Sequence, residues 1–278
     1  MERPTFKDYT TMRIGGEFKQ IFFPNTVDKL CDFIKQTKEK YIVIGNGSNF
    51  IPSDEYFDGV VISLKKMKLD LEISNDIQKV PSSISMPKLA NILAENNLDA
   101  FFLSSIPGTI GGGVYMNASS YNHAISDYFI KGEFINEQGE YLELTKEELQ
   151  FGYRKSLLQE EPLILIYAYF SFPKCENIRE KITKYQVIRR RTQPLNCLNS
   201  GSVFKNPEST YAWQLIDSCG LRGFKIGDAK ISEKHANFIV NEGNATAQDI
   251  FDLHNYVKEK VFEKTGTLLE SEWVFFNW

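Results

Sequence analysis

The segment SIPGTIGGGVYMNA (residues 105–118) constrains the fold of this chain more than any other stretch. A single tight turn needs one or two glycines, whereas this density indicates a backbone packed flat against something large, for which a planar ring system is the natural candidate. A flexible glycine loop is less favoured, because apolar residues interleave with the glycines as in a packed segment. We expect polar contacts from Thr109 and Asn117 and no regular secondary structure here. The glycines are Gly108, Gly111, Gly112 and Gly113.

Composition excludes several classes of protein. With 278 residues and 42% apolar side chains, the chain can form two or three packed units. The 32 basic and 36 acidic residues leave a net charge of -4 without a long block of like charge, so we expect neither a nucleic-acid nor a membrane partner. Apolar runs such as residues 163–172 are shorter than the roughly 20 residues of a membrane span, and the start of the chain lacks the apolar core of a signal peptide. These features predict a cytoplasmic protein.

Cysteines and histidines are too dispersed to form a metal site. We expect the cysteines to be reduced thiols, most of them buried, and we expect no bound metal. Any redox chemistry must then come from an organic cofactor. The residues concerned are Cys31, Cys175, Cys197 and Cys219, with His123, His235 and His254.

Local signals predict a chain of mixed helices and strands. Thr246 is expected to cap the last helix, and glycines to end the last two. A hairpin turn is expected at 136–139. The helices are predicted at 26–37, 87–96, about 177–191, 212–219 and 246–264. The strands are predicted at 20–23, 41–44, 59–64, 162–172 and 268–276.

The loop IGNGSN (44–49) follows a wholly apolar strand and resembles a phosphate cradle. Its glycines admit a ligand to the backbone, and Ser48 and Asn49 can add side-chain hydrogen bonds. The loop matches neither the G-x-G-x-x-G fingerprint nor a Walker loop, because no lysine or helix signal follows it. An ordinary glycine turn after a buried strand explains the residues equally well, and both interpretations stay open.

Two motifs combine basic residues with aromatic ones. FGYRKS (151–156) places an arginine between an aromatic residue and a lysine, which by itself is typical of a solvated surface pair. In NSGSVFKNP (199–207), the pair Lys205 and Asn206 suits an anionic group. Ser202 either acts as an acid whose proton is steered by neighbours or only bonds a nearby backbone group.

The motif LLESEW (268–273) places Glu270 and Glu272 on one face of a strand, since strand side chains alternate. This face forms either a partly buried site or the solvent side of an edge strand. The spacing does not decide between the two.

Taken in chain order, the motifs resemble the series found in the UDP-N-acetylenolpyruvoylglucosamine reductase family of flavoenzymes. The resemblance covers about residues 10–276, and the direct run from 201 to 212 is similar to the shorter branch of that family. The motifs are YTTMRIGG, IGNGSN, IPGTIGGGVYMNA, FGYRKS, GSVFKNP, SEKHANFIVN and LESEW.

The resemblance implies an α+β fold in three domains. Two FAD-binding subdomains of the vanillyl-alcohol-oxidase type would occupy residues 1–66 and 67–188, and a C-terminal α+β substrate-binding domain would occupy residues 189–278. The implied reaction is the reduction of UDP-N-acetyl-3-O-(1-carboxyvinyl)glucosamine to UDP-N-acetylmuramate for peptidoglycan synthesis. The implied cofactors are FAD and NADPH, used in a ping-pong mechanism by a protein that we expect to be a monomer.

On this resemblance, the glycine-rich loops would hold FAD. The first loop would bind the diphosphate, and the second would line the rest of the flavin. The expected FAD contacts are Gly45, Asn46, Gly47, Ser48, Asn49, Pro107, Gly108, Thr109, Gly111, Gly112, Asn117 and Arg191.

Three side chains would carry the chemistry that the resemblance implies. Hydride addition to the terminal vinyl carbon builds negative charge on the neighbouring carbon and its carboxylate, which Arg154 would stabilise. Glu272 would keep the intermediate in its enol form, and Ser202 would deliver a proton to the adjacent carbon. The expected substrate contacts are Tyr153, Lys205, Asn206 and His235.

The chain departs from the family pattern in three places. Glu272-Trp273-Val274 stands where Glu-Val-Arg is common, Gly227-Asp228 replaces a frequent Gly-Gly, and NASSYNHA lacks the glycine that usually follows the tyrosine. Two other functions stay open: a flavin oxidoreductase of the same fold that oxidises an alcohol or sugar, and a catalytically silent homologue that binds flavin or nucleotide sugar. GSVFKNP and SEKHANFIVN argue against the first, because they belong to the substrate domain.

Overall fold

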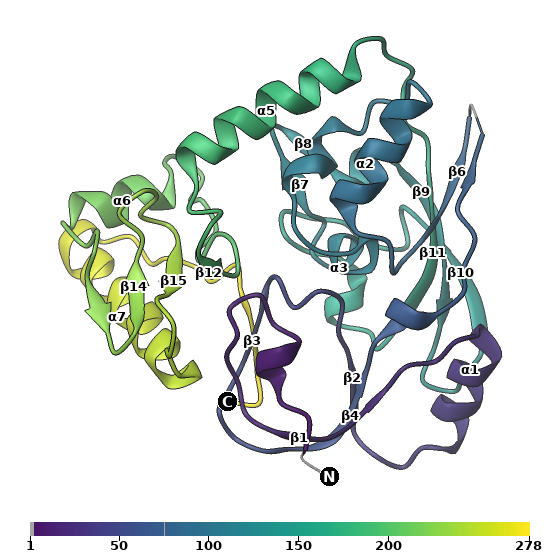
Figure 1. Cartoon of the computed structure of the whole chain (residues 1–278), viewed down its shortest axis with the longest axis horizontal. Coiled ribbons are helices and arrows are strands. Elements are labelled where there is room, and N and C mark those ends of the chain that lie inside the picture. The colour runs from purple at the N-terminus through teal and green to yellow at the C-terminus, as the bar shows by residue number, and fades with distance from the viewer. Residues whose placement is uncertain (1–2, 75) are drawn as a thin grey trace. The chain divides into compact units, whose positions relative to one another are not determined.

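The computed structural model describes residues 3–74 and 76–278 (Figure 1). These residues form two compact units, each discontinuous in sequence. Unit 1 contains Met1–Gln20, Gly47–Asp58 and Ile188–Trp278, and unit 2 contains Ile21–Asn46 and Gly59–Val187. The chain therefore passes from unit 2 to unit 1 within the IGNGSN loop.

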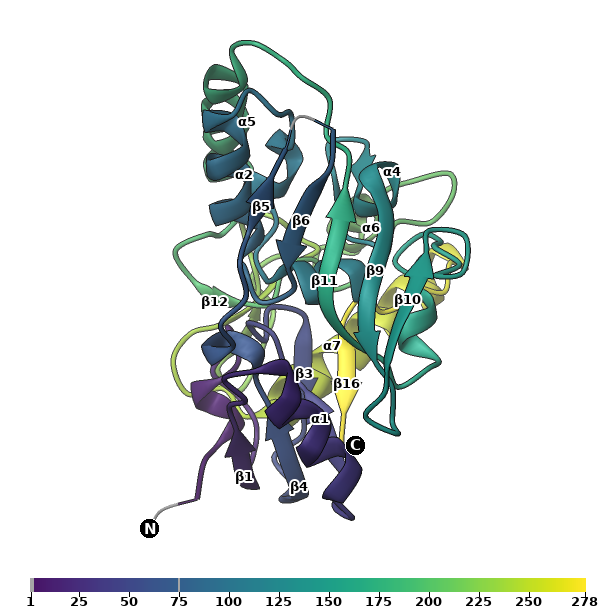
Figure 2. The same cartoon turned by 90° about the vertical axis from the view of Figure 1, so that its right-hand side faces the viewer.

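Unit 2 is built on a five-stranded antiparallel sheet with the order β10-β9-β11-β6-β5 (Figure 2). The predicted hairpin turn at 136–139 is confirmed, since it joins β9 to β10 with Gly139 at a φ of 70°. The predicted buried strand at 162–172 is confirmed as β11 in the middle of the sheet. The strands are β5 (Glu72–Ile73), β6 (Gln78–Pro81), β9 (Phe129–Ile135), β10 (Tyr141–Thr145) and β11 (Ile164–Phe170).

Apolar side chains cover both faces of this sheet. Phe134 belongs to the same buried cluster as the apolar side of α2 (Met86–Glu95). Its neighbour Ile135 points to the other face, as the period of two requires, and belongs to the cluster that contains the buried side of α1 (Val27–Gln36). Both helices were predicted, and Thr26 caps α1 by accepting a hydrogen bond from the N–H of its third residue at 3.3 Å.

The remaining elements of unit 2 are short. β2 and β4 pair in parallel in a small sheet with the order β1-β4-β2, and β1 and β4 each cross from one unit to the other along the chain. The strands are β1 (Phe18–Phe22), β2 (Tyr41–Val43), β4 (Phe57–Ile62), β7 (Ser119–Ser120) and β8 (His123–Ala124), and the short helix α4 is Ile125–Tyr128. Within residues 3–74 and 76–278, the 3-10 helices are Phe6–Asp8, Leu64–Lys66, Phe101–Ser105 and Leu157–Gln159.

The expectation of no regular structure in the glycine-rich segment is wrong. Ile110–Tyr115 forms the short helix α3, although glycine in a helix interior costs about 1 kcal/mol relative to alanine. Thr109 caps the helix, because its Oγ1 accepts a hydrogen bond from the Gly112 N–H at 3.3 Å. Ile110 and Val114 are fully buried. Tertiary burial of these side chains offsets the poor helix propensity of the glycines.

Unit 1 combines a four-stranded antiparallel sheet, in the order β12-β15-β14-β13, with α6 and α7 (Figure 1). Thr246 caps α7 as predicted, and Gly266 ends it with a φ of 70°. A parallel pair, β3 and β16, joins the N-terminal part of this unit to the C-terminal part. The helices are α5 (Ile178–Thr192), which enters the unit, α6 (Ala212–Ser218) and α7 (Ala247–Thr265). The strands are β3 (Phe50–Pro52), β12 (Leu198–Asn199), β13 (Lys225–Ile226), β14 (Ala229–Ile231), β15 (Ile239–Asn241) and β16 (Val274–Phe276).

The predicted strand at 268–276 is too long. Only its last three residues form β16, because the chain pairs with two different partners in turn. Before β16, a single antiparallel bridge joins Ser271 to Phe204. One bridge does not make a ladder, so the glutamates of LESEW lie outside a regular strand.

The expectation that most cysteines are buried is also wrong. Cys197 is exposed, and the other three thiols are half-buried at the edges of the apolar cores. All four are free. Among the described residues, no helix is both long and apolar enough to cross a membrane. The same part of the chain contains no group of three or more His, Cys, Asp or Glu residues arranged to hold a metal ion.

Candidate active site

Two glycine-rich segments meet in unit 2. Gly45 lies so close to the cap of α3 that a Cβ atom at this position would stand 2.6 Å from Thr109 Oγ1. The side chain of Asn46 is half-buried and makes no hydrogen bond within residues 3–74 and 76–278. The structure therefore brings the first half of IGNGSN to the start of the helix formed by IPGTIGGG.

The glycines of α3 serve different purposes. Gly113 faces the core, where a Cβ atom would lie 2.5 Å from Ile125 Cδ1 and 2.9 Å from Met86 Sδ. Gly112 is exposed, and the nearest atom to a Cβ there would be Thr109 Oγ1 at 3.8 Å. Packing within the chain explains Gly113 but not Gly112. An exposed backbone without a side chain is a surface that a planar ligand can approach closely.

Arg154 lies at the tip of a two-residue turn that paired backbone hydrogen bonds close between Gly152 and Lys155. Its φ of 56° is a left-handed conformation that non-glycine residues adopt rarely and often at functional sites. The guanidinium donates a hydrogen bond to Ser119 Oγ. Gln159 Nε2 donates to the Arg154 carbonyl at 3.0 Å and to the carbonyl of the last residue of α3 at 2.9 Å. These bonds hold the arginine beside the C-terminal end of α3.

Asn117 and Tyr153 complete this part of the site. Asn117 is buried, with a φ of 41°, and its Nδ2 donates to the Gly152 carbonyl at 2.8 Å. Its Oδ1 accepts a hydrogen bond from the Ser126 N–H at 3.0 Å. The carboxamide thus ties the segment after α3 to the turn of Arg154. Tyr153 is 53% exposed, and its ring centre lies 5.1 Å from Arg154 Cζ.

The second half of IGNGSN belongs to unit 1. A Cβ atom at Gly47, whose φ is 61°, would overlap the Tyr9 carbonyl oxygen, so packing alone explains this glycine. The Gly47 carbonyl accepts a hydrogen bond from the Thr11 N–H at 3.1 Å. Asn49 Nδ2 donates to the Glu272 carbonyl at 2.9 Å. The loop is therefore joined directly to the glutamate of LESEW.

Backbone pairing brings the segments of Ser202 and Glu272 together. The Glu272 N–H donates to the Val203 carbonyl at 2.8 Å, and the Lys205 N–H donates to the Glu270 carbonyl at 2.9 Å. Lys205 Nζ also lies 3.4 Å from the Glu270 carboxylate. Of the two glutamates, Glu270 faces solvent, with 74% of its side chain exposed, while Glu272 is half-buried.

Asn237 holds the same segment from its other side. Its carbonyl accepts from the Val203 N–H at 3.0 Å, and its buried side chain bonds the N–H and the carbonyl of Phe204 at 2.9 and 2.8 Å. Asn206 Oδ1 accepts from the N–H of Ala212, the first residue of α6, at 3.1 Å. Asn237, Thr11 and Gln159 were not predicted as functional residues. Asn237 and Thr11 lie inside motifs of the family series, whereas no signal marks Gln159.

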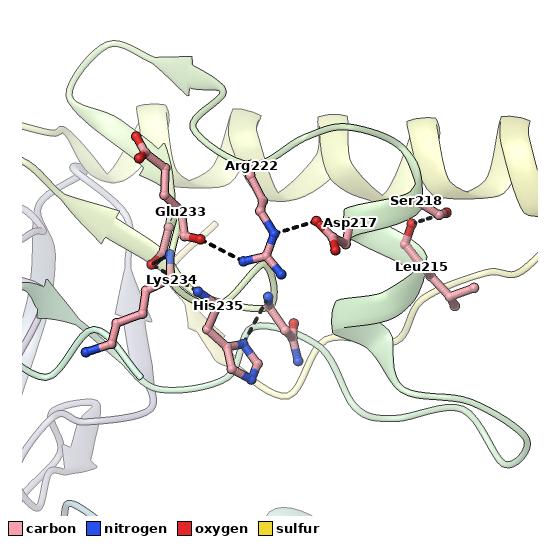
Figure 3. A network of polar contacts seen from close by, with 9 residues as sticks. Leu215, Asp217, Ser218, Arg222, Glu233, Lys234 and His235 are labelled. Carbon is pink, nitrogen blue, oxygen red and sulfur yellow. Dashed lines mark hydrogen bonds and ion pairs between the residues drawn. The ribbon is translucent and has the colours of Figure 1, made fainter. Parts of the chain in front are cut away.

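His235 lies in a network of polar contacts beside α6 (Figure 3). Its Nδ1 accepts a hydrogen bond from the Asn237 N–H at 3.3 Å, so the neutral ring carries its proton on Nε2. Nearby Arg222 is held by the Asp217 carboxylate and by the Glu233 carbonyl, the latter at 2.7 Å. Burial, followed by the Arg222 cation, lowers the pKa of His235 below its usual range. His235 is therefore neutral near pH 7.

Each unit gathers a part of the predicted site. Arg191 is exposed in the last turn of α5. Pro107 is exposed, and Gly108 is buried with a φ of 116°. Unit 2 contains Gly45, Asn46, Pro107, Gly108, Thr109, Gly111, Gly112, Asn117, Tyr153 and Arg154. Unit 1 contains Gly47, Ser48, Asn49, Arg191, Ser202, Lys205, Asn206, His235 and Glu272.

Two departures from the family pattern have structural explanations. Gly227 and Asp228 form the two-residue turn between β13 and β14, and Asp228 Oδ2 accepts a hydrogen bond from the Asn244 N–H at 3.0 Å. The turn between β7 and β8 has φ values of 52° at Tyr121 and 63° at Asn122. Asparagine tolerates this left-handed conformation, so it can stand where glycine is usual.

Comparisons with known proteins cover nearly the whole chain. The FAD-binding domain family matches residues 19–145, and the C-terminal domain of UDP-N-acetylenolpyruvoylglucosamine reductase matches residues 193–276. UDP-N-acetylenolpyruvoylglucosamine reductase of Caldicellulosiruptor saccharolyticus is 40% identical over 96% of this chain and 88% of its own length. The enzyme of that name from Rickettsia prowazekii is 41% identical over 96% of this chain and 92% of its own. The crystal structure of the reductase from Thermus caldophilus is 32% identical, with a TM-score of 0.85 over 99% of this chain and 98% of that one.

The fold and the candidate site define an FAD-dependent oxidoreductase. Its α+β architecture consists of an FAD-binding region and a C-terminal α+β domain, which confirms the expected α+β fold class. The chain belongs to the UDP-N-acetylenolpyruvoylglucosamine reductase family. Membership confirms the expected enzyme class and the cofactors FAD and NADPH. The exposed, side-chain-free Gly112 fits a closely approaching flavin.

Proposed function

We propose that this enzyme catalyses the NADPH-dependent, FAD-mediated reduction of UDP-N-acetyl-3-O-(1-carboxyvinyl)glucosamine to UDP-N-acetylmuramate in peptidoglycan precursor synthesis. Family membership supports the reaction. The observation that carries it in this chain is the 2.8 Å backbone hydrogen bond from the Glu272 N–H to the Val203 carbonyl, which joins the segment of the proposed catalytic glutamate to the segment of Ser202. FAD held by the glycine-rich segments would supply the redox chemistry, namely hydride transfer from NADPH to the terminal vinyl carbon of the substrate.

Arg154 stabilises the charge that the hydride creates. An electron pair is left on the carbon that bears the carboxylate, and the guanidinium binds this carboxylate as a permanent, planar cation. Preorganised stabilisation of this kind is worth about 3 kcal/mol. The bonds from Gln159 fix the turn of Arg154 before substrate binds. Glu272 keeps the intermediate in its enol form.

Ser202 completes the reduction. Its hydroxyl proton goes to the carbon next to the carboxylate, which forms the second new C–H bond, and the serine oxygen regains a proton from solvent. One hydride and one proton convert the vinyl ether into the saturated lactyl ether. Delivery from a fixed side chain sets the configuration of the new centre.

The binding residues follow the same proposal. Tyr153, Lys205, Asn206 and His235 bind the nucleotide sugar. Three functional regions are assigned, at residues 1–66, 67–188 and 189–278, in a monomer that acts in the cytoplasm without a nucleic-acid or membrane partner. FAD is bound by Gly45, Asn46, Gly47, Ser48, Asn49, Pro107, Gly108, Thr109, Gly111, Gly112, Asn117 and Arg191.

The test is the variant Ser202→Ala, with Ser218→Ala at the end of α6 as the matched control. NADPH still reduces the flavin of Ser202→Ala, while formation of UDP-N-acetylmuramate falls by at least about a hundredfold, because general acid catalysis is lost. The control retains wild-type turnover. Product is measured by mass spectrometry, and flavin reduction by absorbance. Normal turnover of Ser202→Ala would remove Ser202 from the mechanism.

A further inference from the structure

The turn that precedes Ser202 is held from two sides. Ser200 is 1% exposed, and its carbonyl accepts a hydrogen bond from Trp273 Nε1 at 2.9 Å. On the other side, Thr11 Oγ1 donates to the Asn199 carbonyl at 2.7 Å. Gly201 follows with a φ of 74°, and a Cβ atom there would meet no atom of the described residues within 4 Å. The Gly201 N–H itself donates to Asn199 Oδ1 at 3.0 Å. Together these hydrogen bonds hold the turn that leads to Ser202.

Trp273 also belongs to the segment of the proposed catalytic glutamate. It follows Glu272 directly and is 4% exposed in the core of unit 1. Its ring lies 6.3 Å from that of His254, which stacks on Phe204 at 4.8 Å. Phe204 comes two residues after Ser202, so this aromatic cluster supports both segments. The indole adds the directional bond that apolar packing lacks.

We propose that Trp273 is a positioning residue for Ser202. Its indole N–H fixes the plane of the Ser200 carbonyl, and through Gly201 it fixes the direction from which the serine hydroxyl delivers its proton. The proposal rests on the proposed function, because it concerns the step assigned to Ser202. Valine, the residue that is common at this position in the family, has no side-chain N–H to donate.

The variant Trp273→Phe tests this role, since it keeps an aromatic ring but removes the N–H donor. Trp278→Phe is the matched control, because Trp278 Nε1 donates to the Ile51 carbonyl at 3.1 Å, away from the turn of Ser202. For each holoenzyme, rapid quenching measures product formation in a single turnover, in H2O and in D2O. Stopped-flow absorbance measures flavin reduction by NADPH separately.

Trp273→Phe is expected to lower the single-turnover rate about tenfold, because a small misplacement of a reacting group is costly. Its solvent isotope effect rises, since proton delivery becomes slower relative to the other steps. Flavin reduction by NADPH does not change, and Trp278→Phe changes neither rate. A purely structural role for the indole would not raise the isotope effect selectively.

Wild-type values for both the rate and the isotope effect of Trp273→Phe would overturn the proposal. If this variant fails to bind FAD, benzothienylalanine at position 273 takes its place, because it has the shape of tryptophan without the N–H. Ser202→Ala is measured alongside. Wild-type turnover in Ser202→Ala would show that the proposed function itself has failed, whereas a slow Ser202→Ala with a normal Trp273→Phe would reject only the positioning role.

Discussion

Gly112 and Gly113 are neighbours in one short helix, yet only Gly113 is required by the packing of the core. A side chain at Gly113 would overlap Ile125 and Met86 of the same unit. Among the described residues, a Cβ atom at Gly112 would meet only Thr109 Oγ1, at 3.8 Å. At Arg154, an unfavourable backbone conformation is likewise explained by the contacts around it. Its left-handed backbone costs about 1 to 2 kcal/mol, which the bonds of its turn offset, and the result is a guanidinium oriented in advance.

The two glycines allow a matched pair of variants. Gly113→Ala is expected to destabilise the FAD-free protein by about 1 to 3 kcal/mol, because it overpacks the core. Gly112→Ala is expected to leave that stability unchanged or slightly raised, since alanine favours a helix, but to weaken FAD binding at least about tenfold. Urea unfolding of the apoprotein and titration with FAD by flavin fluorescence measure the two effects. Unchanged FAD affinity in Gly112→Ala would place the flavin elsewhere.

At the scale of elements, helix α7 of unit 1 packs against one of the proposed catalytic segments. Its ends are defined by the capping box of Thr246 and Asp249 and by Gly266. In its middle, His254 is 3% exposed, and its ring stacks on Phe204. Burial lowers the pKa of His254 to about 4. His254 is therefore neutral near pH 7, where its ring packs against the segment that carries Ser202.

Because of His254, the folded protein should become less stable as the pH is lowered. The unfolded chain binds a proton at this residue below about pH 6.5, whereas the folded protein does so only near pH 4, so stability decreases as the pH falls through that window. The loss attributable to His254 is about 3 kcal/mol. His254→Phe keeps the ring stacking and should remove this part of the pH dependence. Urea unfolding between pH 7 and pH 4 checks it, and parallel curves for the two proteins would contradict the account.

Local signals predicted α7 and α1, because both carry caps and a one-sided apolar pattern that any partner surface can bury. The same reasoning failed for α3, whose helix depends on the burial of Ile110 and Val114 by distant parts of unit 2. The predicted strand before β16 was too long, because no local sequence pattern indicates that the pairing partner changes from Phe204 to β3. Elements that depend on tertiary contacts are the ones that local patterns miss.

Over the whole molecule, unit 1 is assembled from three separated parts of the chain. Met12, Ile14 and Ile51 are fully buried in the same core as the helices and strands that follow residue 188. Asn49 and Glu272, which share a hydrogen bond, are 223 residues apart. The family resemblance identified both residues, but no sequence pattern indicates their contact. The bond of Trp273 to Ser200 could not be predicted for the same reason.

The C-terminal region alone should not fold cooperatively. A fragment of residues 189–278 lacks the three buried side chains from the N-terminal parts and the β3 partner of β16, which leaves cavities and an unpaired strand in the core of unit 1. Circular dichroism, dye binding and the dispersion of amide signals should show a loosely packed state, with the full chain as the control. A cooperative unfolding transition in the fragment would contradict this expectation.

The most direct test of the account follows the flavin absorbance of the purified protein without oxygen, in two additions. NADPH should bleach the yellow band, and the enolpyruvyl nucleotide sugar should then restore it with the formation of one UDP-N-acetylmuramate per flavin. A flavin that NADPH reduces but that this substrate leaves bleached, or a protein that cannot be loaded with FAD, would contradict the proposed function.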